Sequence, residues 1–222
     1  SNGNQWGVKI EYAVQDKPQG IAEAFIIGEK FIGKDQVTLI LGDNIFYGFD
    51  FKNFINKNKN KAKIFLYKVK NPSRYGVAEI KDKKIISIEE KPSFPKSKYA
   101  VTGIYSYDNK AIEIAKSLKP SNRNELEITD LNNQYIKSKN LLPIFLSEGS
   151  VWLDAGTSET LLQASQFVQT IQNRQQIQIS CPEELAWKSK LISNTQINNL
   201  IKLMPNNSYR FYLEDIVNKE NK

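Results

Sequence analysis

The sequence contains no histidine and a single cysteine, Cys181, among its 222 residues. The absence of imidazole excludes Ser/His and Cys/His nucleophile systems and transition metals held by histidine. A single thiol excludes disulfide frameworks and zinc sites built from cysteine alone. Carboxylates, lysine, arginine, tyrosine and backbone amides remain, together with any hard cation that carboxylates bind. This inventory favours phosphate chemistry.

Long apolar runs are also absent. The longest apolar stretches, such as residues 37–41, have the length of a strand and fall far below the roughly 20 residues that span a bilayer. The polar start at residues 1–5 is not typical of a signal peptide. We therefore expect a cytoplasmic protein without a membrane partner.

The formal net charge of +7 permits an anionic partner, and residues 57–63 are the densest basic run. Its lysines alternate with asparagine, and no aromatic side chains are interleaved for stacking on bases. A solvated loop is the preferred interpretation of this run. We expect no nucleic-acid partner.

Apolar spacing alternates between helical and strand patterns along the chain. Helices are predicted at residues 21–32, 109–118 and 125–139 and from 158 onward, and strands at 37–41, 63–69, 99–107, 141–146 and 151–153. Residues 76–80 and 85–88 flank a polar turn and predict a hairpin. The alternation predicts a three-layer α/β/α sandwich with a mainly parallel sheet, a hairpin insertion and C-terminal helices.

No linker rich in glycine, proline or serine divides the chain. We expect one α/β domain over residues 1–180, with a C-terminal helical region over 181–222 packed on the same domain. Asp108 is expected to N-cap the helix that follows it. The helix from Ser158 is expected to bury an apolar face made of Leu161, Ala164, Ser165, Val168 and Ile171.

Two carboxylates follow predicted strands. The run at 37–41 leads into a G-D-N motif that contains Asp43, and the run at 151–153 leads into D-A-G-T, which begins with Asp154. In open α/β sheets the ligand lies beyond the carboxyl ends of the strands. Two converging carboxylates suit Mg²⁺, which completes its shell with water and substrate phosphates. Either aspartate alone could equally be a turn or N-cap residue.

Two cations are candidates for phosphate contacts. Lys91 precedes Pro92, which favours an extended backbone at Lys91 and an outward ammonium. A surface salt bridge between Lys91 and Glu89 is the alternative. Arg123 could donate two parallel hydrogen bonds to phosphate oxygens, or it could stabilise only the helix that follows it.

The loop at residues 15–20 precedes the first predicted helix. The amide of Gly20 therefore lies near the positive end of a helix dipole, and the Gln15 side chain offers both a donor and an acceptor. These groups can form hydrogen bonds with the polar edge of a pyrimidine base. A proline/glycine loop without a ligand is the alternative interpretation.

Seven ordered motifs together closely resemble glucose-1-phosphate thymidylyltransferases, sugar nucleotidyltransferases of Rossmann-like fold that make dTDP-glucose for deoxysugars such as rhamnose. They lie at residues 14–22, 41–48, 74–77, 89–92, 99–105, 125–130 and 152–157. The resemblance implies roles for four groups of residues. Asp43 and Asp154 would hold Mg²⁺, and Gln15 and Gly20 would recognise thymine. Lys91 would contact the sugar phosphate, and Arg123 would assist phosphate or sugar binding. The sugar would meet Tyr75, Gly76, Glu90, Val101, Thr102 and Trp152, of which Trp152 flanks the metal site or the sugar.

The reaction implied by the resemblance is direct. An oxygen of glucose 1-phosphate attacks the α-phosphorus of dTTP in line, and pyrophosphate leaves. No covalent enzyme intermediate is required, which agrees with the missing histidine, because positioning and charge neutralisation can catalyse nucleotidyl transfer. Family members are usually tetramers, so a homo-oligomer is expected.

This chain departs from the family pattern at two places. Family members begin with a strand and a loop of the form G-G-x-G-T-R-L-x-P that cradles the triphosphate, and this chain lacks both. A fragment of an ordinary enzyme is therefore expected. Glu148 stands where family members often carry a basic residue linked to a regulatory nucleotide site, which argues against feedback control.

Two alternatives remain open. A related sugar nucleotidyltransferase that uses UTP or CTP would share the metal and phosphate residues. A non-catalytic paralogue that binds dTDP-sugars, with a regulatory role, would keep the sugar pocket without the triphosphate loop.

We expect these 222 residues on their own to bind triphosphate poorly and to turn over little or nothing. The reason is that the amides and the arginine of the missing loop would not contact the triphosphate. Release of pyrophosphate from dTTP and glucose 1-phosphate measures this. Robust formation of dTDP-glucose by the isolated chain would contradict the expectation.

Overall fold

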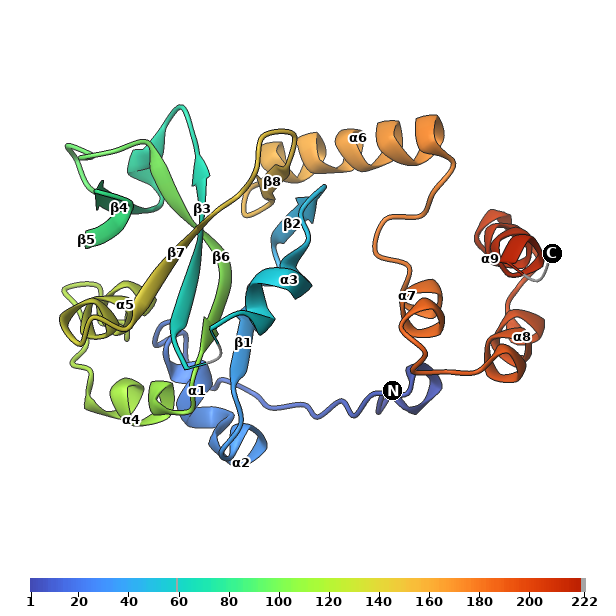
Figure 1. Ribbon diagram of the computed structural model, residues 1–222, viewed down its shortest axis with the longest axis horizontal. Helices are drawn as coiled ribbons and strands as arrows, with labels where there is room; N and C mark the ends of the chain where they lie inside the picture. The colour runs from blue at the N-terminus through green and yellow to red at the C-terminus, as the bar shows by residue number, and fades with distance from the viewer. Residues whose placement is uncertain (59, 221–222) are drawn as a thin grey trace. The chain divides into compact units, whose positions relative to one another are not determined.

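The structure, a computed structural model, describes residues 1–58 and 60–220, except for the side chain of residue 56. It divides into two compact units (Figure 1). The sheet unit is Ala13–Leu161, and the helical unit combines Ser1–Tyr12 with Leu162–Lys222. The sequence predicts a boundary at residue 180, whereas these units divide the chain after Leu161. Lys59 of the basic run and the end of the predicted C-terminal region, residues 221–222, lie outside the described residues.

The main sheet has the strand order β5-β4-β6-β3-β7, and β1 pairs with the free side of β6. The strands are β1 Val37–Ile40, β3 Ala62–Lys68, β4 Gly76–Lys81, β5 Lys84–Glu90, β6 Tyr99–Tyr107 and β7 Leu141–Phe145. Within the described residues β3 and β7 pair in parallel, and the other ladders are antiparallel. The sheet is therefore mainly antiparallel among the described residues and not mainly parallel as predicted. Its parallel pair is β3 with β7, whose connection through residues 69–140 provides the long crossover that a parallel pair needs.

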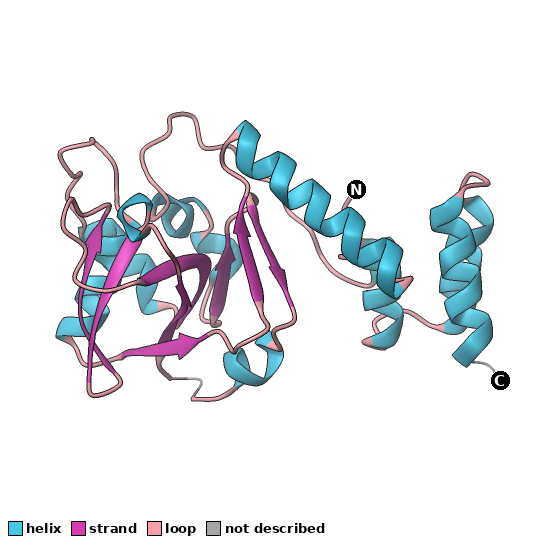
Figure 2. Ribbon diagram, turned by 90° about the horizontal axis from the view of Figure 1, so that it is seen from above, coloured by secondary structure: helices cyan, strands magenta, loops and turns pink. Residues whose placement is uncertain are grey.

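Helices cover both faces of this sheet (Figure 2), as a three-layer sandwich requires. On one face, Ile64 and Leu66 of β3 join a core with residues of α1 (Glu23–Ile27), α4 (Lys110–Ser117) and α5 (Ile128–Lys137). On the other face, Phe65 contacts the rings of Phe49 and Phe51 at the start of α3 (Phe51–Asn56). Successive residues of a strand point to opposite faces, which explains this division. The predicted α/β sandwich is confirmed.

The hairpin insertion is also confirmed. β4 and β5 pair from Gly76 opposite Glu90 to Lys81 opposite Lys84. Asp82 and Lys83 both have positive φ, 51° and 60°, as a type I′ turn requires. The hairpin carries Glu90 to the end of β5 and Gly76 to the start of β4, so these two residues lie side by side.

A small second sheet pairs β2 (Asn44–Tyr47) with β8 (Val151–Asp154) in antiparallel register. Asn44 lies opposite Asp154, so the chain segments that follow Asp43 and end at Asp154 are fixed together. The sequence does not predict β2, because its four residues follow the G-D-N turn directly and read as part of a loop.

The basic run at residues 57–63 is only partly the solvated loop that was expected. Lys63 belongs to β3 and is 1% exposed. Its Nζ donates to the carbonyl oxygens of Ile55 at 3.3 Å and Lys61 at 3.2 Å. Burial lowers the pKa of the Lys63 ammonium. This lysine therefore caps the end of α3 and has no surface role.

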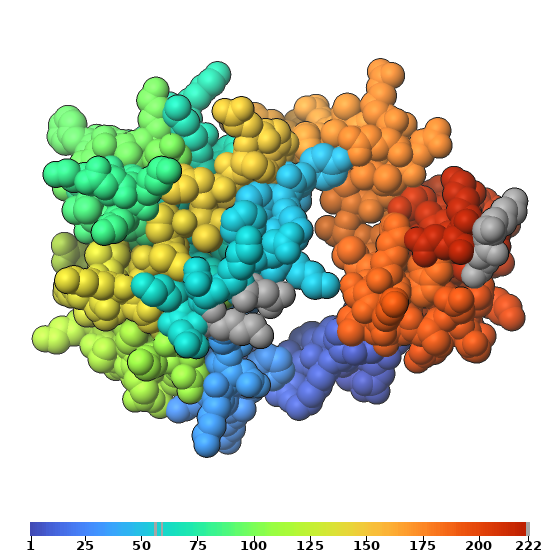
Figure 3. Space-filling model, in the orientation of Figure 1, coloured from blue at the N-terminus to red at the C-terminus, as the bar shows by residue number. Residues whose placement is uncertain are grey.

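The helical unit contains α7 (Pro182–Lys188), α8 (Asn194–Leu203) and α9 (Ser208–Glu220), which pack around Trp187, Ile197 and Leu213. The N-terminal turn η1 (Asn4–Trp6) lies against α7, as the blue and orange atoms of Figure 3 show. Buried Glu183 accepts from the Trp6 indole at 3.2 Å and from the Tyr209 hydroxyl. This carboxylate therefore joins the first residues of the chain to the C-terminal helices.

Three local expectations are corrected. The helix predicted at 21–32 is broken at Gly28 into α1 and α2 (Glu29–Ile32). The N-cap of α4 is Asn109, while the Asp108 carboxylate accepts from the Tyr135 hydroxyl. Of the predicted apolar face of α6 (Ser158–Gln175), only Ala164 is buried, and Leu161 is 54% exposed.

Among the described residues, no helix has both the length and the apolar composition needed to cross a bilayer.

The carboxamide of Asn133 on α5 closes the outer edge of β5. Its Oδ1 accepts from the Ile88 amide at 3.2 Å, and its Nδ2 donates to the Ile88 carbonyl at 3.0 Å. These are the backbone groups that an added strand would use. We expect Asn133→Ala to lower the free energy of unfolding by about 1–3 kcal/mol, because both groups lose their partner. Urea denaturation measures this.

The matched control is Gln134→Ala, a similar truncation at the next, exposed position of the same helix. It should change the free energy of unfolding by less than about 0.5 kcal/mol. Equal effects of the two substitutions would show that the Asn133 contact does not stabilise the sheet edge.

Candidate active site

A cavity of about 210 Å³ in the sheet unit collects most of the predicted site residues. It is bounded by β2 and β8, by the open ends of the β4–β5 hairpin and by the middle of β6. The predicted residues that line it are Asp43, Tyr75, Gly76, Glu90, Lys91, Val101, Trp152 and Asp154. The structure does not place Gln15, Gly20, Thr102 or Arg123 in its lining.

The carboxylates of Asp43 and Asp154 converge on one point. A Cβ atom built on Gly156 would lie 3.2 Å from Asp154 Oδ1 and 3.4 Å from Asp43 Oδ2. The backbone holds the two segments together, because the Ala155 amide donates to the Asp43 carbonyl at 2.8 Å. The Gly156 amide donates to Asp154 Oδ1 at 3.2 Å. Strands far apart in the sequence thus present a pair of acids to the same cavity.

This pair fits a hard divalent cation. Groups of three or more His, Cys, Asp or Glu side chains suited to a metal are absent from the described residues. Zinc usually takes at least three protein ligands, whereas Mg²⁺ is often held by one or two carboxylates together with substrate phosphates. The donor set at Asp43 and Asp154 therefore suits magnesium better than a transition metal.

Lys91 is held at the cavity by its backbone. Its amide donates to the Tyr75 carbonyl at 3.0 Å, and its φ is 45°, in the left-handed region. The extended backbone expected before Pro92 is thus not found, because this hydrogen bond closes the end of the hairpin. Within residues 1–58 and 60–220, no carboxylate forms an ion pair with Lys91. The ammonium is therefore available to an anionic ligand.

Arg123 binds carboxylates. Its Nε and Nη2 donate to the two oxygens of Glu127 at 3.1 and 2.7 Å. Its Nη2 also lies 3.8 Å from Glu90 Oε1. The hydrogen bonds to Glu127 raise the pKa of the guanidinium further. Because Glu127 is only 8% exposed, it needs this counter-charge, and Arg123 faces it.

Glu90 is oriented by a second contact. The Thr129 hydroxyl donates to Glu90 Oε2 at 2.7 Å. A Cβ on Gly76 would lie 3.2 Å from Glu90 Oε2 and 3.3 Å from Thr129 Oγ1, so a side chain at residue 76 would crowd this pair. The glycine therefore keeps the carboxylate open to the cavity.

The remaining predicted residues lie outside the cavity lining. The Gln15 side chain donates to the Gly20 carbonyl and to Glu23 on α1. Gly20 lies against the backbone of Leu126, and its neighbour Ile21 reaches the cavity. Thr102 is buried and donates to the Phe65 carbonyl at 3.0 Å. Alternation along β6 explains this last case, because Val101 and Gly103 point to the cavity face instead.

Tyr105 is a cavity residue that the sequence analysis did not single out. It is buried and lines the cavity, yet its hydroxyl has no hydrogen-bond partner among the described residues. Burial, followed by the charges of Glu90 and Asp43, raises the pKa of this phenol. It is therefore a neutral hydrogen-bond donor at the cavity. The strand alternation from Val101 through Gly103 to Tyr105 could have identified Tyr105 as a cavity residue from the sequence.

Arg74, Asn44 and Thr129 also line the cavity without having been predicted as site residues. Trp152 closes one side of the cavity: its ring centroid lies 5.0 Å from that of Tyr75, and its Nε1 donates to Asn44 Oδ1 at 2.6 Å. Burial, followed by the charge of Asp154, raises the pKa of Tyr75. The negative charge of Asp154 therefore acts electrostatically on the aromatic wall of the cavity.

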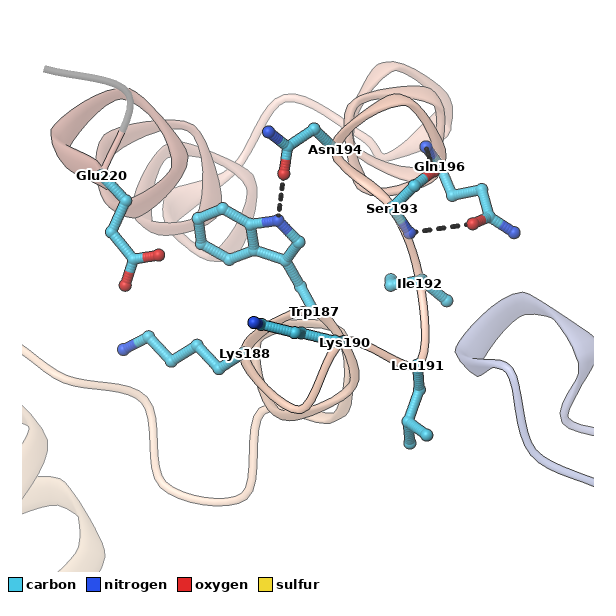
Figure 4. A pocket seen from close by; sticks show the side chains of 9 residues that line it. All are labelled: Trp187, Lys188, Lys190, Leu191, Ile192, Ser193, Asn194, Gln196 and Glu220. Atoms are coloured by element: carbon cyan, nitrogen blue, oxygen red, sulfur yellow. Dashed lines mark hydrogen bonds between the residues drawn. The ribbon is translucent and has the colours of Figure 1, made fainter.

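The helical unit has a hollow of its own between α7, α8 and α9 (Figure 4). Several of its polar groups already have partners. The Trp187 indole donates to Asn194 at 2.7 Å, Ser193 and Gln196 form a capping box, and Lys188 binds Glu184 at 2.7 Å. These contacts stabilise the helix ends, so we assign no chemistry to this hollow.

Sequence comparisons point to one group of proteins. A family model described as nucleotidyl transferase matches residues 1–171. Glucose-1-phosphate thymidylyltransferase of Neisseria meningitidis serogroup A is 49% identical over 98% of this chain and 77% of its own length. The enzyme of the same name from Mycolicibacterium smegmatis is 45% identical over 99% of this chain and 77% of its own length.

Solved structures agree with the sequence relatives. A glucose-1-phosphate thymidylyltransferase from Bacillus anthracis, in complex with a sucrose, has a TM-score of 0.69 and 48% identity and covers 75% of this chain and 68% of its own. A UDP-glucose pyrophosphorylase complexed with UDP-glucose has a TM-score of 0.63 and 25% identity, over 71% of this chain and 65% of its own.

The carboxylates of Asp43 and Asp154 both lie close to Gly156, so a side chain at this position should disturb cation binding. We expect Gly156→Ala to weaken binding of Mn²⁺, used as a probe for magnesium, by roughly tenfold, about 1.4 kcal/mol. The added methyl would crowd both carboxylates, while the backbone of Gly156 is not left-handed. Electron paramagnetic resonance of free Mn²⁺ measures the affinity.

Gly42→Ala is the matched control, because a Cβ at Gly42 meets nothing within 4 Å and the residue adjoins Asp43. It should leave the Mn²⁺ affinity within twofold of the parent value. Loss of affinity in both variants, or in neither, would argue that the point shared by Asp43 and Asp154 is not the cation site.

Proposed function

The chain belongs to the nucleotidyl transferase family, and from this premise we propose that its cavity serves the formation of dTDP-glucose and pyrophosphate from dTTP and glucose 1-phosphate. One observation carries the proposal. Asp43, Asp154, Lys91 and Glu90 line one cavity. Such a set can hold a cation, neutralise a phosphate and accept hydrogen bonds from a sugar.

The sugar end of the ligand fits the hairpin side of the cavity. Glu90, fixed by Thr129, can accept hydrogen bonds from sugar hydroxyls, and the unpartnered Tyr105 hydroxyl can donate one. Val101 and Tyr75 supply apolar and aromatic surface. Gly76 leaves the space through which the sugar reaches Glu90.

The phosphate end fits the side where the acids and the lysine lie. Lys91 places a fixed positive charge at the cavity without a protein counter-ion among the described residues, which lowers the cost of bringing in a phosphate. Asp43 and Asp154 would hold Mg²⁺. Bound there, the ion would neutralise charge on the phosphate oxygens. No residue of the chain need form a covalent bond with substrate.

Arg123 has a positioning role in this proposal. Its guanidinium compensates the buried Glu127 and lies near Glu90, so it would hold the acceptor side chains in place. Recognition of thymine by Gln15 and Gly20 stays a prediction. It requires the Gln15 carboxamide to exchange its present contacts with Gly20 and Glu23 for the base.

A UTP-dependent sugar nucleotidyltransferase is the second candidate, favoured by the similarity in fold to UDP-glucose pyrophosphorylase. A cytoplasmic location, a role in a rhamnose-type deoxysugar pathway and a homo-oligomeric state stay predictions.

Titration calorimetry with nucleotide sugars tests the proposal. In the presence of Mg²⁺ the chain should bind dTDP-glucose at least tenfold more tightly than UDP-glucose or CDP-glucose. Preference for UDP-glucose would support the second candidate. Failure to bind any of the three would refute a nucleotide-sugar site.

Tyr105→Phe probes the sugar contact by itself. We expect it to weaken dTDP-glucose binding by roughly tenfold, about 1.4 kcal/mol, because only the unpartnered hydroxyl is removed. Tyr107→Phe, two residues further along β6, is the control: its hydroxyl donates to Asn132 in the core at 2.7 Å, so its loss should lower stability and leave binding unchanged. The reverse pattern would exclude Tyr105 from the ligand site.

A further inference from the structure

The side chain of Asn44 joins three separate parts of the cavity wall. Its Nδ2 donates to Asp43 Oδ1 at 2.7 Å. Its Oδ1 accepts from the Gly103 amide of β6 at 2.9 Å and from the Trp152 indole of β8 at 2.6 Å. Its backbone lies opposite Asp154 in the β2–β8 ladder. Asn44 therefore contacts Asp43 through its side chain and pairs with Asp154 through its backbone.

Close packing against Gly103 also restricts the Asn44 side chain. A Cβ on Gly103 would lie 2.5 Å from both Cγ and Oδ1 of Asn44 and 2.7 Å from its Nδ2. Such distances are far below normal contact, so the carboxamide lies directly on the backbone of β6. The glycine at residue 103 is thus required by the position of Asn44, and the carboxamide has little freedom to rotate.

The contacts also select the residue type. Gly103 and Trp152 both donate, so residue 44 must accept two hydrogen bonds, while the neighbouring Asp43 carboxylate requires a donor. A carboxamide supplies an acceptor oxygen and a donor nitrogen at a short distance. Aspartate would accept but could not donate, and it would place a second negative charge beside Asp43. Alanine would leave all three partners without a bond.

We propose that Asn44 is a positioning residue for the cation site: it orients the Asp43 carboxylate towards Asp154 and fixes the Trp152 indole at the same time. The inference rests on the proposed function, because it assigns the aspartate pair to a cation. It predicts that the affinity for the cation and the environment of the Trp152 indole change together when Asn44 is altered.

Two variants test this in the full chain, with Mn²⁺ alone as the probe. Asn44→Ala removes the three hydrogen bonds, and Gly103→Ala keeps the carboxamide but displaces it. Each should weaken Mn²⁺ binding by roughly tenfold. Each should also shift the Trp152 indole N–H signal in a proton–nitrogen correlation spectrum, where Trp6 and Trp187 serve as internal references. The Trp152 signal is assigned with Trp152→Phe.

Asn53→Ala is the control, because Asn53 is an exposed residue of α3 that is absent from the cavity lining. Within the described part of the chain its side chain bonds to Asp50 alone. It should change neither readout. A folded Asn44→Ala or Gly103→Ala variant with Mn²⁺ affinity within twofold of the parent would overturn the inference. So would weakened binding with an unmoved Trp152 signal, since the indole and the carboxylate would then be independent.

The experiment separates this inference from the proposed function. Neither readout uses a nucleotide or a sugar, so coupled changes in Mn²⁺ affinity and the Trp152 signal would support the role of Asn44 even if dTDP-glucose failed to bind. Tight dTDP-glucose binding without any effect of Asn44 on Mn²⁺ would refute the positioning role alone. If Asn44→Ala does not fold, Gly103→Ala still decides the question.

Discussion

The antiparallel pairing of β2 with β8 is the constraint on which the site depends. It places Asn44 opposite Asp154, and the Ala155 amide extends the pairing to the Asp43 carbonyl. Without this short ladder the two aspartates would belong to unrelated turns, and neither would have a defined partner. A few backbone hydrogen bonds, formed across a long stretch of chain, therefore decide whether the two carboxylates meet in one cavity.

Two converging carboxylates repel each other, so the fold must stabilise them in the absence of a cation. The Asn44 carboxamide donates to Asp43 and the Gly156 amide to Asp154. Each hydrogen bond limits the rotation of the carboxylate that accepts it. The acid pair is thus held in a defined orientation, while Lys91 lines the same cavity without forming an ion pair in the described residues.

Much of this arrangement could be predicted from the sequence, because it follows from local patterns. The apolar run of β6 predicts the bounds of this strand, Tyr99–Tyr107. The aspartates that follow two apolar runs, Asp43 and Asp154, predict the acidic pair. β2 was missed because four residues after a turn carry too little periodicity to be distinguished from a loop. Thr102 was misplaced because the motif does not say which residues of β6 face the cavity, whereas the alternation along the strand does.

Arg123 shows why a charged residue type alone does not define a phosphate ligand. The sequence places it before a run of acidic residues, and the structure uses its fork on Glu127, which is nearly buried. A buried carboxylate without a counter-charge costs several kcal/mol, more than an exposed contact with phosphate returns, so the guanidinium is committed to the protein first. Lys91, by contrast, lines the cavity and forms no ion pair within the described residues, while its amide holds it at the end of the hairpin.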